Sequence, residues 1–164
     1  MSYWTPPAPV KKITLEEHFL TDYFNAYEDT IVPSFRPDFR KWMQDRITDF
    51  TEIRLKEMDE NNIEIQVLSL TTPGVQAIQD PKEAVREAKN ANDFIAEVVA
   101  RYPKRFAAFA ALPCQSPKEA ADELERAVTQ LGFKGALING HSNGEYLDHE
   151  KFWVIWERAE ELEV

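Results

Sequence analysis

Strand-like and helix-like segments alternate along most of this sequence, and that order constrains the fold more than any other feature. The expected strands cover residues 11–19, 63–70, 105–113 and 133–140, and helical spacing of apolar residues follows each of them. The first helix is expected over residues 45–61. Alternation of this kind predicts a parallel sheet that is covered by helices.

Two of the expected helices carry recognisable start signals. Asp80 can cap the amino end of a helix, Pro81 fits the first turn, and Glu83 completes a capping arrangement. The same order recurs at Ser116, and Gly132 is expected to end that helix. The residues expected on the buried sides of the helix after Asp80 and of the last helix are Val85, Ala88, Phe94, Ile95 and Val98, and Phe152, Trp153, Ile155, Trp156, Ala159 and Leu162.

Two α/β folds fit this order, an open doubly wound sheet and a (β/α)8 barrel of the TIM type. No Gly-rich dinucleotide fingerprint or phosphate-binding P-loop follows an expected strand, which disfavours the open nucleotide-binding sheet. Polar residues follow the strands instead, where barrel enzymes build their active sites. They are Glu16, His18, Ser69, Thr71, Cys114, Asn139 and His141. We expect a TIM-barrel-like α/β fold, of which these 164 residues supply about the first four βα units, because a barrel takes about 250 residues.

Composition sets the expected organisation and partners. Residues 1–10 are rich in proline and are expected to form an extended arm, and residues 11–164 are expected to form one domain. A net charge of -10 argues against nucleic acid and against a membrane as partners. The single cysteine, Cys114, rules out an intrachain disulfide. With no membrane-length apolar run and no signal-peptide layout, we expect a cytoplasmic protein.

The first expected strand contains the most specific chemical pattern, "LEEHF". Strand alternation places Glu16 and His18 on one face together with Thr14. The other face is expected to pack against helices and carries Ile13, Leu15 and Glu17, the last of which is expected to meet solvent or a basic partner. A carboxylate and an imidazole side by side are two ligands for a divalent metal ion.

Several other polar residues are weaker candidates. Asn139 either lines a pocket or bonds nearby backbone as a turn residue. Thr71 is a better pocket candidate than Ser69, and both hydroxyls can equally bond adjacent backbone. His141 is a weaker pocket candidate than Asn139.

Cys114 and Arg54 are interpreted as structural residues. Cys114 has no neighbour in the sequence that would activate its thiol, so it is expected to be a small packing residue. Arg54 is more typical of a surface ion pair than of a contact to a substrate carboxylate. Packing is also the main interpretation for the aromatic residues Phe19, Tyr23, Phe24, Tyr27, Phe35 and Trp42, with the wall of an aromatic-ring pocket as the alternative.

Four blocks of the sequence together resemble a known enzyme family. "KITLEEHF", "RLKEMDENNIEIQVLSLTTPGVQ", "ANDFIAEVVARYPKRFAAFAALP" and "LGFKGALINGH" are similar to the amidohydrolase-related decarboxylases of the dihydroxybenzoate and γ-resorcylate type. The similarity runs from about residue 11 to the last residue. The resemblance implies the (β/α)8 metal-dependent hydrolase fold. It also implies divalent-metal-dependent, non-oxidative decarboxylation of hydroxylated aromatic carboxylic acids.

The resemblance also implies roles for particular residues. Glu16 and His18 match the positions that bind one Zn²⁺ or Mn²⁺ ion in the family, and Asn139 matches a stretch that lines the substrate pocket, to which we add Thr71. The family's catalytic Asp and a further His ligand lie beyond residue 164, so no catalytic residue is expected in this chain. The chain alone is therefore expected to be inactive.

Three interpretations remain open at this stage. The first is the amino-terminal half of a decarboxylase with a small aromatic carboxylic acid as substrate. The second is a hydrolase of the amidohydrolase superfamily, which Glu16 in place of the more common His disfavours. The third is a non-catalytic scaffold that pairs with an intact homologue. A partial barrel would have open sheet edges, so we also expect a homo-oligomer or association through those edges.

Overall fold

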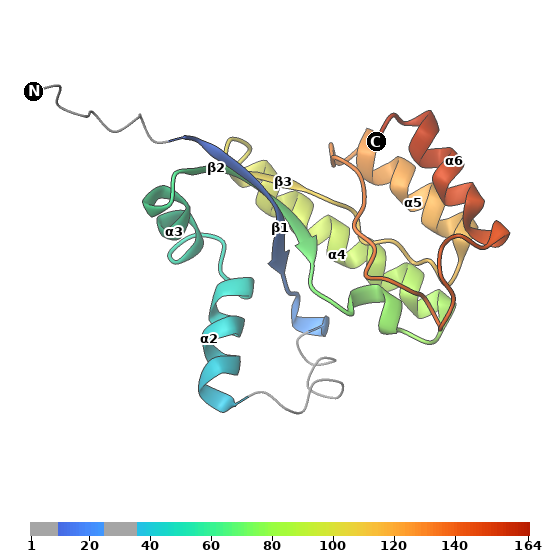
Figure 1. Cartoon of the computed structure of the whole chain (residues 1–164), viewed down its shortest axis with the longest axis horizontal. Helices are drawn as coiled ribbons and strands as arrows, with labels where there is room; N and C mark the ends of the chain where they lie inside the picture. The colour runs from blue at the N-terminus through green and yellow to red at the C-terminus, as the bar shows by residue number, and fades with distance from the viewer. Residues whose placement is uncertain (1–9, 25–35) are drawn as a thin grey trace, which may run out of the picture.

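The computed structural model describes residues 10–24 and 36–164 of the chain (Figure 1). Most of the expected proline-rich arm, together with Tyr27 and Phe35, lies outside these residues. In chain order the elements are β1 (Lys12–Phe19), α2 (Pro37–Thr48), α3 (Arg54–Glu60), β2 (Ile63–Leu70), the 3-10 helix η1 (Gly74–Ala77), α4 (Pro81–Arg101), β3 (Phe106–Ala108), α5 (Pro117–Thr129), the 3-10 helix η2 (Glu150–Phe152) and α6 (Trp153–Glu161).

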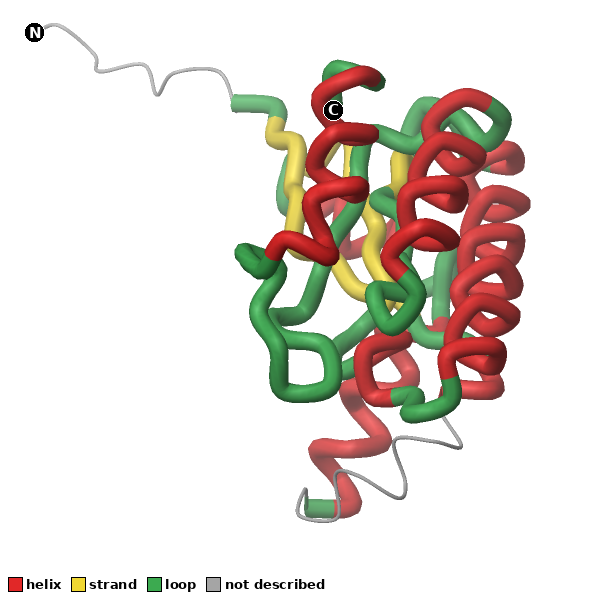
Figure 2. The backbone as a smooth tube through the Cα atoms, turned by 90° about the vertical axis from the view of Figure 1, so that its right-hand side faces the viewer, coloured by secondary structure: helices red, strands yellow, loops and turns green. Residues whose placement is uncertain are grey.

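The three strands form one parallel sheet in the order β1-β2-β3. Helices lie between consecutive strands in the chain and pack alongside the sheet, as Figure 2 shows. The predicted parallel α/β architecture is therefore confirmed. No helix among the described residues combines the length and the apolar character needed to cross a membrane.

The third and fourth expected strands are shorter than the sequence suggests. β3 spans only Phe106–Ala108, and residues 133–140 form no strand but a single parallel bridge between Ala110 and Ala136. Two backbone hydrogen bonds flank this bridge, from Ala110 N to Gly135 O at 2.8 Å and from Leu137 N to Ala110 O at 3.1 Å. Gly135 has φ of +140°, far from the extended conformation, which interrupts the ladder at this point.

The helix expected over residues 45–61 is in fact two helices, α2 and α3. Asp49 separates them, because its carboxylate accepts hydrogen bonds from four successive backbone N–H groups, those of Thr51, Glu52, Ile53 and Arg54. Although burial raises the pKa of Asp49, these donors hold it below its usual value. Apolar spacing alone does not reveal such a local break.

Of the two expected helix caps, one is formed. Asp80 accepts a hydrogen bond from the backbone N–H of Glu83 at 2.8 Å, and α4 begins at Pro81. Ser116 precedes α5 but makes no side-chain cap bond. Gly132 follows α5 with φ of +75°, the left-handed conformation expected of a helix-ending glycine.

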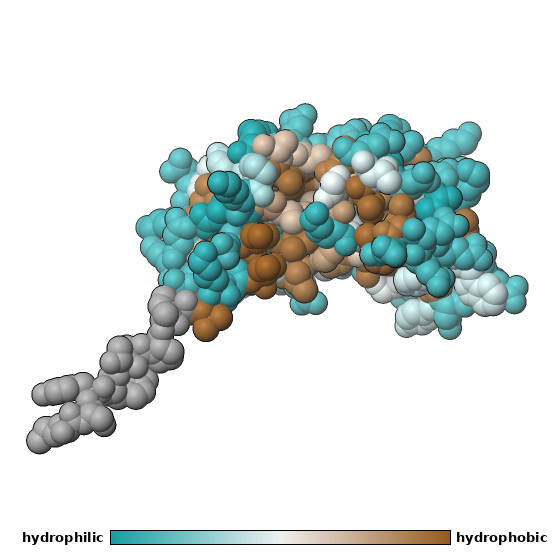
Figure 3. Space-filling view, turned by 90° about the horizontal axis from the view of Figure 1, so that it is seen from above, coloured by the Kyte–Doolittle hydropathy of each residue, from teal (hydrophilic) through white to brown (hydrophobic). Residues whose placement is uncertain are grey.

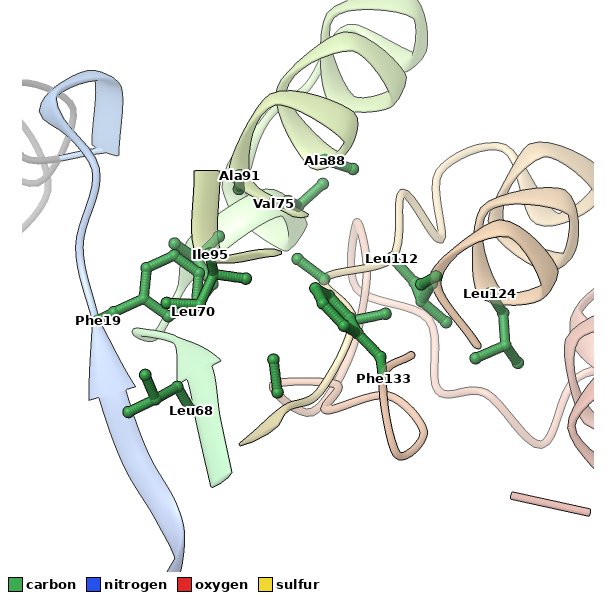
Figure 4. Packing of buried hydrophobic residues seen from close by; sticks show 14 of the residues in the cluster. Phe19, Leu68, Leu70, Val75, Ala88, Ala91, Ile95, Leu112, Leu124 and Phe133 are labelled. Atoms are coloured by element: carbon green, nitrogen blue, oxygen red, sulfur yellow. The ribbon is translucent and has the colours of Figure 1, made fainter. Parts of the chain in front are cut away.

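The hydrophobic core lies between the strands and α4. In Figure 4, Phe19, Leu68 and Leu70 of the strands lie against the α4 side that carries Ala91 and Ile95. Ile95 and Leu68 are fully buried. Burying a side chain of this size contributes about 1.5–3 kcal/mol.

Three aromatic residues expected in the core are partly exposed to solvent instead. Phe94 is 38% exposed, Trp153 52% and Trp156 49%. The two tryptophans donate their indole N–H groups to the carbonyls of Asp148 and Leu147. Large amphipathic rings of this kind can cover the edge of a core while keeping one side in water.

Candidate functional site at the ends of the first two strands

The carboxyl ends of β1 and β2 lie side by side. In the parallel register His18 pairs with Ser69 and Phe19 pairs with Leu70. The backbone N–H of Thr71 then donates to Phe19 O at 3.0 Å, which continues the ladder by one residue. The register therefore places the imidazole of the "LEEHF" motif beside the hydroxyl-bearing end of β2.

An irregularity in β1 changes which side chains share a face. Thr14 pairs with Gln66 and Glu17 pairs with Leu68, so two residues of β1 lie opposite one residue of β2. This extra residue is a β-bulge, which breaks strict alternation. Thr14 therefore shares its face with Glu17 and not with His18, contrary to the sequence prediction.

The same irregularity exposes the residues that were expected to pack against helices. Ile13 pairs with Ile65, which places it on the face of Ser69 and His18. Ile13 is 62% exposed and Leu15 is 54% exposed. The predicted helix-packing role of these two residues is wrong.

The regular register resumes at Glu17, so Glu16 lies inside the bulge and His18 lies beyond it. Alternation back from Glu17 would give Glu16 the face of His18, and this common face stays a prediction. The Glu16 carboxylate is exposed, whereas His18 is half-buried. Glu17 lies on the other face, where its charge acts on the guanidinium group of Arg54, as expected for a residue that faces the helix layer.

Ser69 is the site residue whose role the sequence did not reveal. Its Oγ lies 3.0 Å from Nδ1 of His18, and the residue is only 1% exposed. Sequence reasoning weighed this hydroxyl as a pocket residue or as a partner of adjacent backbone. The available signal was positional, because both residues precede the last residue of their strands by one.

Arg54 is buried and is not the surface ion-pair residue that was expected. It donates from Nη2 to His18 O at 2.7 Å and to Arg46 O at 2.9 Å, from Nε to Asp49 O at 2.9 Å, and from Nη1 to Gln66 Oε1 at 3.1 Å. Burial lowers the pKa of Arg54, and nearby carboxylates partly oppose that change. Its guanidinium group therefore fixes the backbone around His18.

The structure does not bring all the predicted site residues into one pocket. Glu16 and His18, together with Glu17 and Arg54, line a cavity of about 380 Å³ beside α2 and α3. Asn139 and His141 line a second cavity of about 650 Å³, formed by the loops after β2 and after residues 133–140. Thr71 lines neither of them.

Asn139 and the other two histidines contact different parts of the chain. A Cβ atom on Gly74 would lie 3.6 Å from Asn139 Nδ2, so the amide lies against the backbone of η1. His141 meets the ring of Tyr146 edge-on at 5.9 Å between centroids. His149 precedes η2, where its Nδ1 accepts from Lys151 N.

The donor set for a metal ion is partial. Glu16 and His18 offer a carboxylate oxygen and an imidazole nitrogen, both of which suit Zn²⁺ and Mn²⁺. Within residues 10–24 and 36–164, no three His, Cys, Asp or Glu side chains gather into a metal-binding group. Because catalytic zinc usually takes three protein ligands, these two residues fit such a site as contributors to it.

Cys114 is a packing residue, as the sequence predicted. It is 1% exposed, and burial raises the pKa of its thiol to about 11 in spite of a hydrogen bond from Gln76. The thiol is therefore protonated at neutral pH and is not a nucleophile.

Comparison with known proteins places almost the whole chain in one protein family. The profile of the family described as Amidohydrolase matches residues 5–164. Among curated proteins, the chain is 46% identical to the γ-resorcylate decarboxylases of Polaromonas sp. and of Rhizobium radiobacter. Each alignment covers 93% of this chain and 48% of the relative, so the chain spans about half the length of the curated relatives it matches.

Solved structures agree with this placement. The crystal structure of a dihydroxybenzoic acid decarboxylase from Polaromonas sp., with bound manganese and the inhibitor 2-nitroresorcinol, superposes with a TM-score of 0.87 at 43% identity. It is matched over 94% of this chain and 47% of that one. A 2,6-dihydroxybenzoate decarboxylase complexed with 2,6-dihydroxybenzoate also gives a TM-score of 0.87, at 42% identity over 94% of this chain and 48% of that one. The predicted fold, a partial TIM-barrel-like α/β structure, is confirmed.

Proposed function

Because the chain belongs to the amidohydrolase family, we propose that it contributes to a divalent-metal-dependent decarboxylase of hydroxylated aromatic carboxylic acids. The observation that carries this proposal is that Glu16 and His18 lie two residues apart near the carboxyl end of β1, with His18 opposite Ser69 of β2. The relatives of the chain support the proposal, because the chain is 46% identical to γ-resorcylate decarboxylases and shares the fold of a relative crystallised with manganese.

In this proposal Glu16 and His18 supply two ligands to one Zn²⁺ or Mn²⁺ ion. When bound, such an ion stabilises negative charge that develops on substrate oxygen atoms. The chain's own contribution is to hold these ligands. Arg54 fixes the backbone of His18, and Ser69 engages its ring. The proton that replaces the carboxyl group is not assigned to any residue of this chain.

Thr71 and Asn139 are proposed to contact the substrate. Thr71 directly follows the strand that carries Ser69, so it stands at the same end of the sheet as the proposed ligands. Asn139 lines the cavity of about 650 Å³ at the loops beyond the strands. These positions suit hydrogen bonds to the hydroxyl and carboxylate groups of a small aromatic acid.

We extend the proposal to location and assembly. A lone, buried cysteine suits the reducing cytoplasm. β1 is the terminal strand of the described sheet, and its outer edge suits pairing with a second copy.

Metal binding and turnover test the function together. The chain is titrated with MnCl2 and ZnCl2, and it is also fused to the remaining half of the Polaromonas γ-resorcylate decarboxylase and assayed with 2,6-dihydroxybenzoate. We expect the chain to bind metal weakly and to be inactive alone, and the fusion to release carbon dioxide. Glu16→Gln and His18→Asn should reduce metal affinity and abolish turnover in the fusion.

Glu64→Gln is the matched control, because Glu64 is an exposed carboxylate near the amino end of β2 that pairs with Lys11 and does not line the cavity of Glu16 and His18. It should leave metal affinity within about twofold of the wild type, a difference well under 1 kcal/mol. Metal binding that survives both Glu16→Gln and His18→Asn would refute the proposed ligands. Cleavage of esters or lactones by the fusion, without decarboxylation, would favour a hydrolase.

A further inference from the structure

The imidazole of His18 is held by a single hydroxyl group. Nδ1 of His18 lies 3.0 Å from Oγ of Ser69, and the two residues are direct partners in the register of β1 and β2. Ser69 is 1% exposed and His18 is half-buried, so the hydroxyl side of this contact is shielded from water. Nδ1 is therefore the ring nitrogen that the protein engages.

The backbone that carries this ring is fixed as well. Arg54 donates to His18 O at 2.7 Å, and Thr71 N donates to the next carbonyl oxygen along the chain, Phe19 O, at 3.0 Å. A ring that is fixed at its backbone and at Nδ1 has one orientation. Nε2, across the ring from Nδ1, is then the nitrogen left for a ligand.

We propose that Ser69 positions His18 for metal binding by holding Nδ1 in both states of the site. Its hydroxyl is the hydrogen-bond donor when no metal is bound and the acceptor when Nε2 binds one. A hydroxyl can do both, because it carries one hydrogen and two lone pairs. A carboxylate or a backbone carbonyl in its place could only accept.

In the metal-free state, the direction of this hydrogen bond follows from the partners available to the Ser69 hydroxyl. Among the described residues, the Ser69 hydroxyl has no hydrogen-bond partner other than His18. A buried O–H group without an acceptor costs about 1–3 kcal/mol, so its hydrogen points to Nδ1. The proton of the neutral imidazole is then on Nε2.

A ligand bond from Nε2 would require the proton of the ring to be on Nδ1, which would donate it to Ser69 Oγ and so reverse the direction of this hydrogen bond. The number of protons on the ring does not change. This half of the inference rests on the proposed function, whereas the metal-free half rests only on the contact between Ser69 and His18.

Nitrogen NMR of the full chain with labelled histidine tests both halves. Spectra are recorded at about pH 8.5, where an ordinary imidazole is neutral, and a His18→Gln variant assigns the His18 signals. In the metal-free wild type we expect the proton on Nε2. Adding ZnCl2 should place the metal on Nε2 and the proton on Nδ1.

Ser69→Ala removes the hydroxyl and should yield a mixture of the two tautomers in the metal-free chain. Val67→Ala is the matched control, because Val67 lies on the same face of β2, two residues before Ser69, and makes no side-chain hydrogen bond. It should keep the wild-type His18 spectrum.

Two results would overturn the inference. One is an identical His18 spectrum in metal-free wild type and Ser69→Ala, and the other is Zn²⁺ bound through Nδ1. If the wild type binds no Zn²⁺ but the metal-free spectra of wild type and Ser69→Ala differ as expected, the proposed function fails. The hydrogen bond from Ser69 to Nδ1 is then still supported.

Discussion

At the residue scale, the buried guanidinium group of Arg54 joins four segments of the chain. It donates to carbonyl groups at the end of β1, in α2 and in the turn after it, and to the amide of Gln66 in β2. Carbonyl acceptors cannot be satisfied by an apolar replacement. The cost of losing Arg54 is therefore mainly the cost of leaving these acceptors buried and unpaired.

We predict that Arg54→Met lowers the free energy of unfolding by about 3 kcal/mol or more, because several buried acceptors lose their donor at about 1–3 kcal/mol each. Urea unfolding measures this change. The control is Arg101→Met on the exposed side of α4, where the side chain of Arg101 is 66% exposed and the change should stay within about 0.5 kcal/mol. Equal effects of the two substitutions would contradict the structural role of Arg54.

Cys114 gives a prediction for alkaline pH. Burial raises the pKa of its thiol from 9.0 to about 11. Between these values the unfolded chain has released the proton while the folded chain still binds it, so rising pH favours unfolding. The folded protein should lose up to about 2 kcal/mol of stability over this range because of Cys114.

The measurement compares urea midpoints of the wild type and of Cys114→Ala at about pH 8 and about pH 10.5. The variant lacks the thiol, so its midpoint should fall less between the two pH values. Parallel decreases in both proteins would mean that Cys114 does not contribute.

At the scale of elements, two nearly identical sequence signals have different outcomes. Asp80 and Ser116 each precede Pro-Lys-Glu, and a helix follows each of them. Only Asp80 caps its helix, because its backbone is extended with ψ of 120° and its carboxylate reaches Glu83 N. Ser116 has φ of -128° and ψ of 84° and makes no such bond.

We predict that Asp80→Ala lowers the free energy of unfolding by about 1 kcal/mol, the usual value for a lost cap. Ser116→Ala provides the matched comparison at the start of α5 and should change stability by less than about 0.5 kcal/mol. Thermal or urea unfolding of both variants measures the difference. A larger effect of Ser116→Ala than of Asp80→Ala would contradict this account.

The sequence predicts most elements but not where their regularity fails. Residues 63–70 are a strand as expected, because the apolar run is short and is bounded by turn residues. The break at Asp49 and the bulge in β1 depend on one side chain or one extra residue, and neither changes the hydrophobic pattern. The face assignments of Ile13 and Thr14 failed for that reason.

The candidate site also has a part that the sequence predicts and a part that it does not. The pair Glu16 and His18 is a local pattern, because the two residues are two positions apart in one strand, although Glu16 lies inside the bulge. The contacts of His18 with Ser69 and Arg54 join residues 51 and 36 positions apart. Such contacts depend on sheet register and helix packing, which no local pattern encodes.

At the scale of the whole molecule, apolar residues remain on the surface beside the terminal strand. Figure 3 shows hydrophobic side chains grouped near the middle of that view and bordered by hydrophilic ones. Ile13 and Leu15 of β1 are 62% and 54% exposed. An exposed terminal strand with apolar side chains favours association with another chain.

We predict that the purified chain associates in a concentration-dependent way, and that Ile13→Lys combined with Leu15→Lys shifts it toward the monomer. The charges make edge pairing and apolar contact unfavourable. Size-exclusion chromatography with light scattering measures the mass. Tyr146→Lys, at a residue that is 67% exposed in the loop before η2, is the control and should not alter association. A wild type that is monomeric at every concentration would refute this prediction.

The bulge in β1 also determines where a change in length keeps His18 opposite Ser69. Removing Leu15 would leave one residue of β1 opposite one of β2 between Thr14 and Glu17, and His18 would stay opposite Ser69. A deletion after Glu17 would instead slide the imidazole past its partner. Homologous proteins that differ in length before Glu17 can therefore carry the same chemistry, so aligning them without gaps at this point misplaces their equivalent residues.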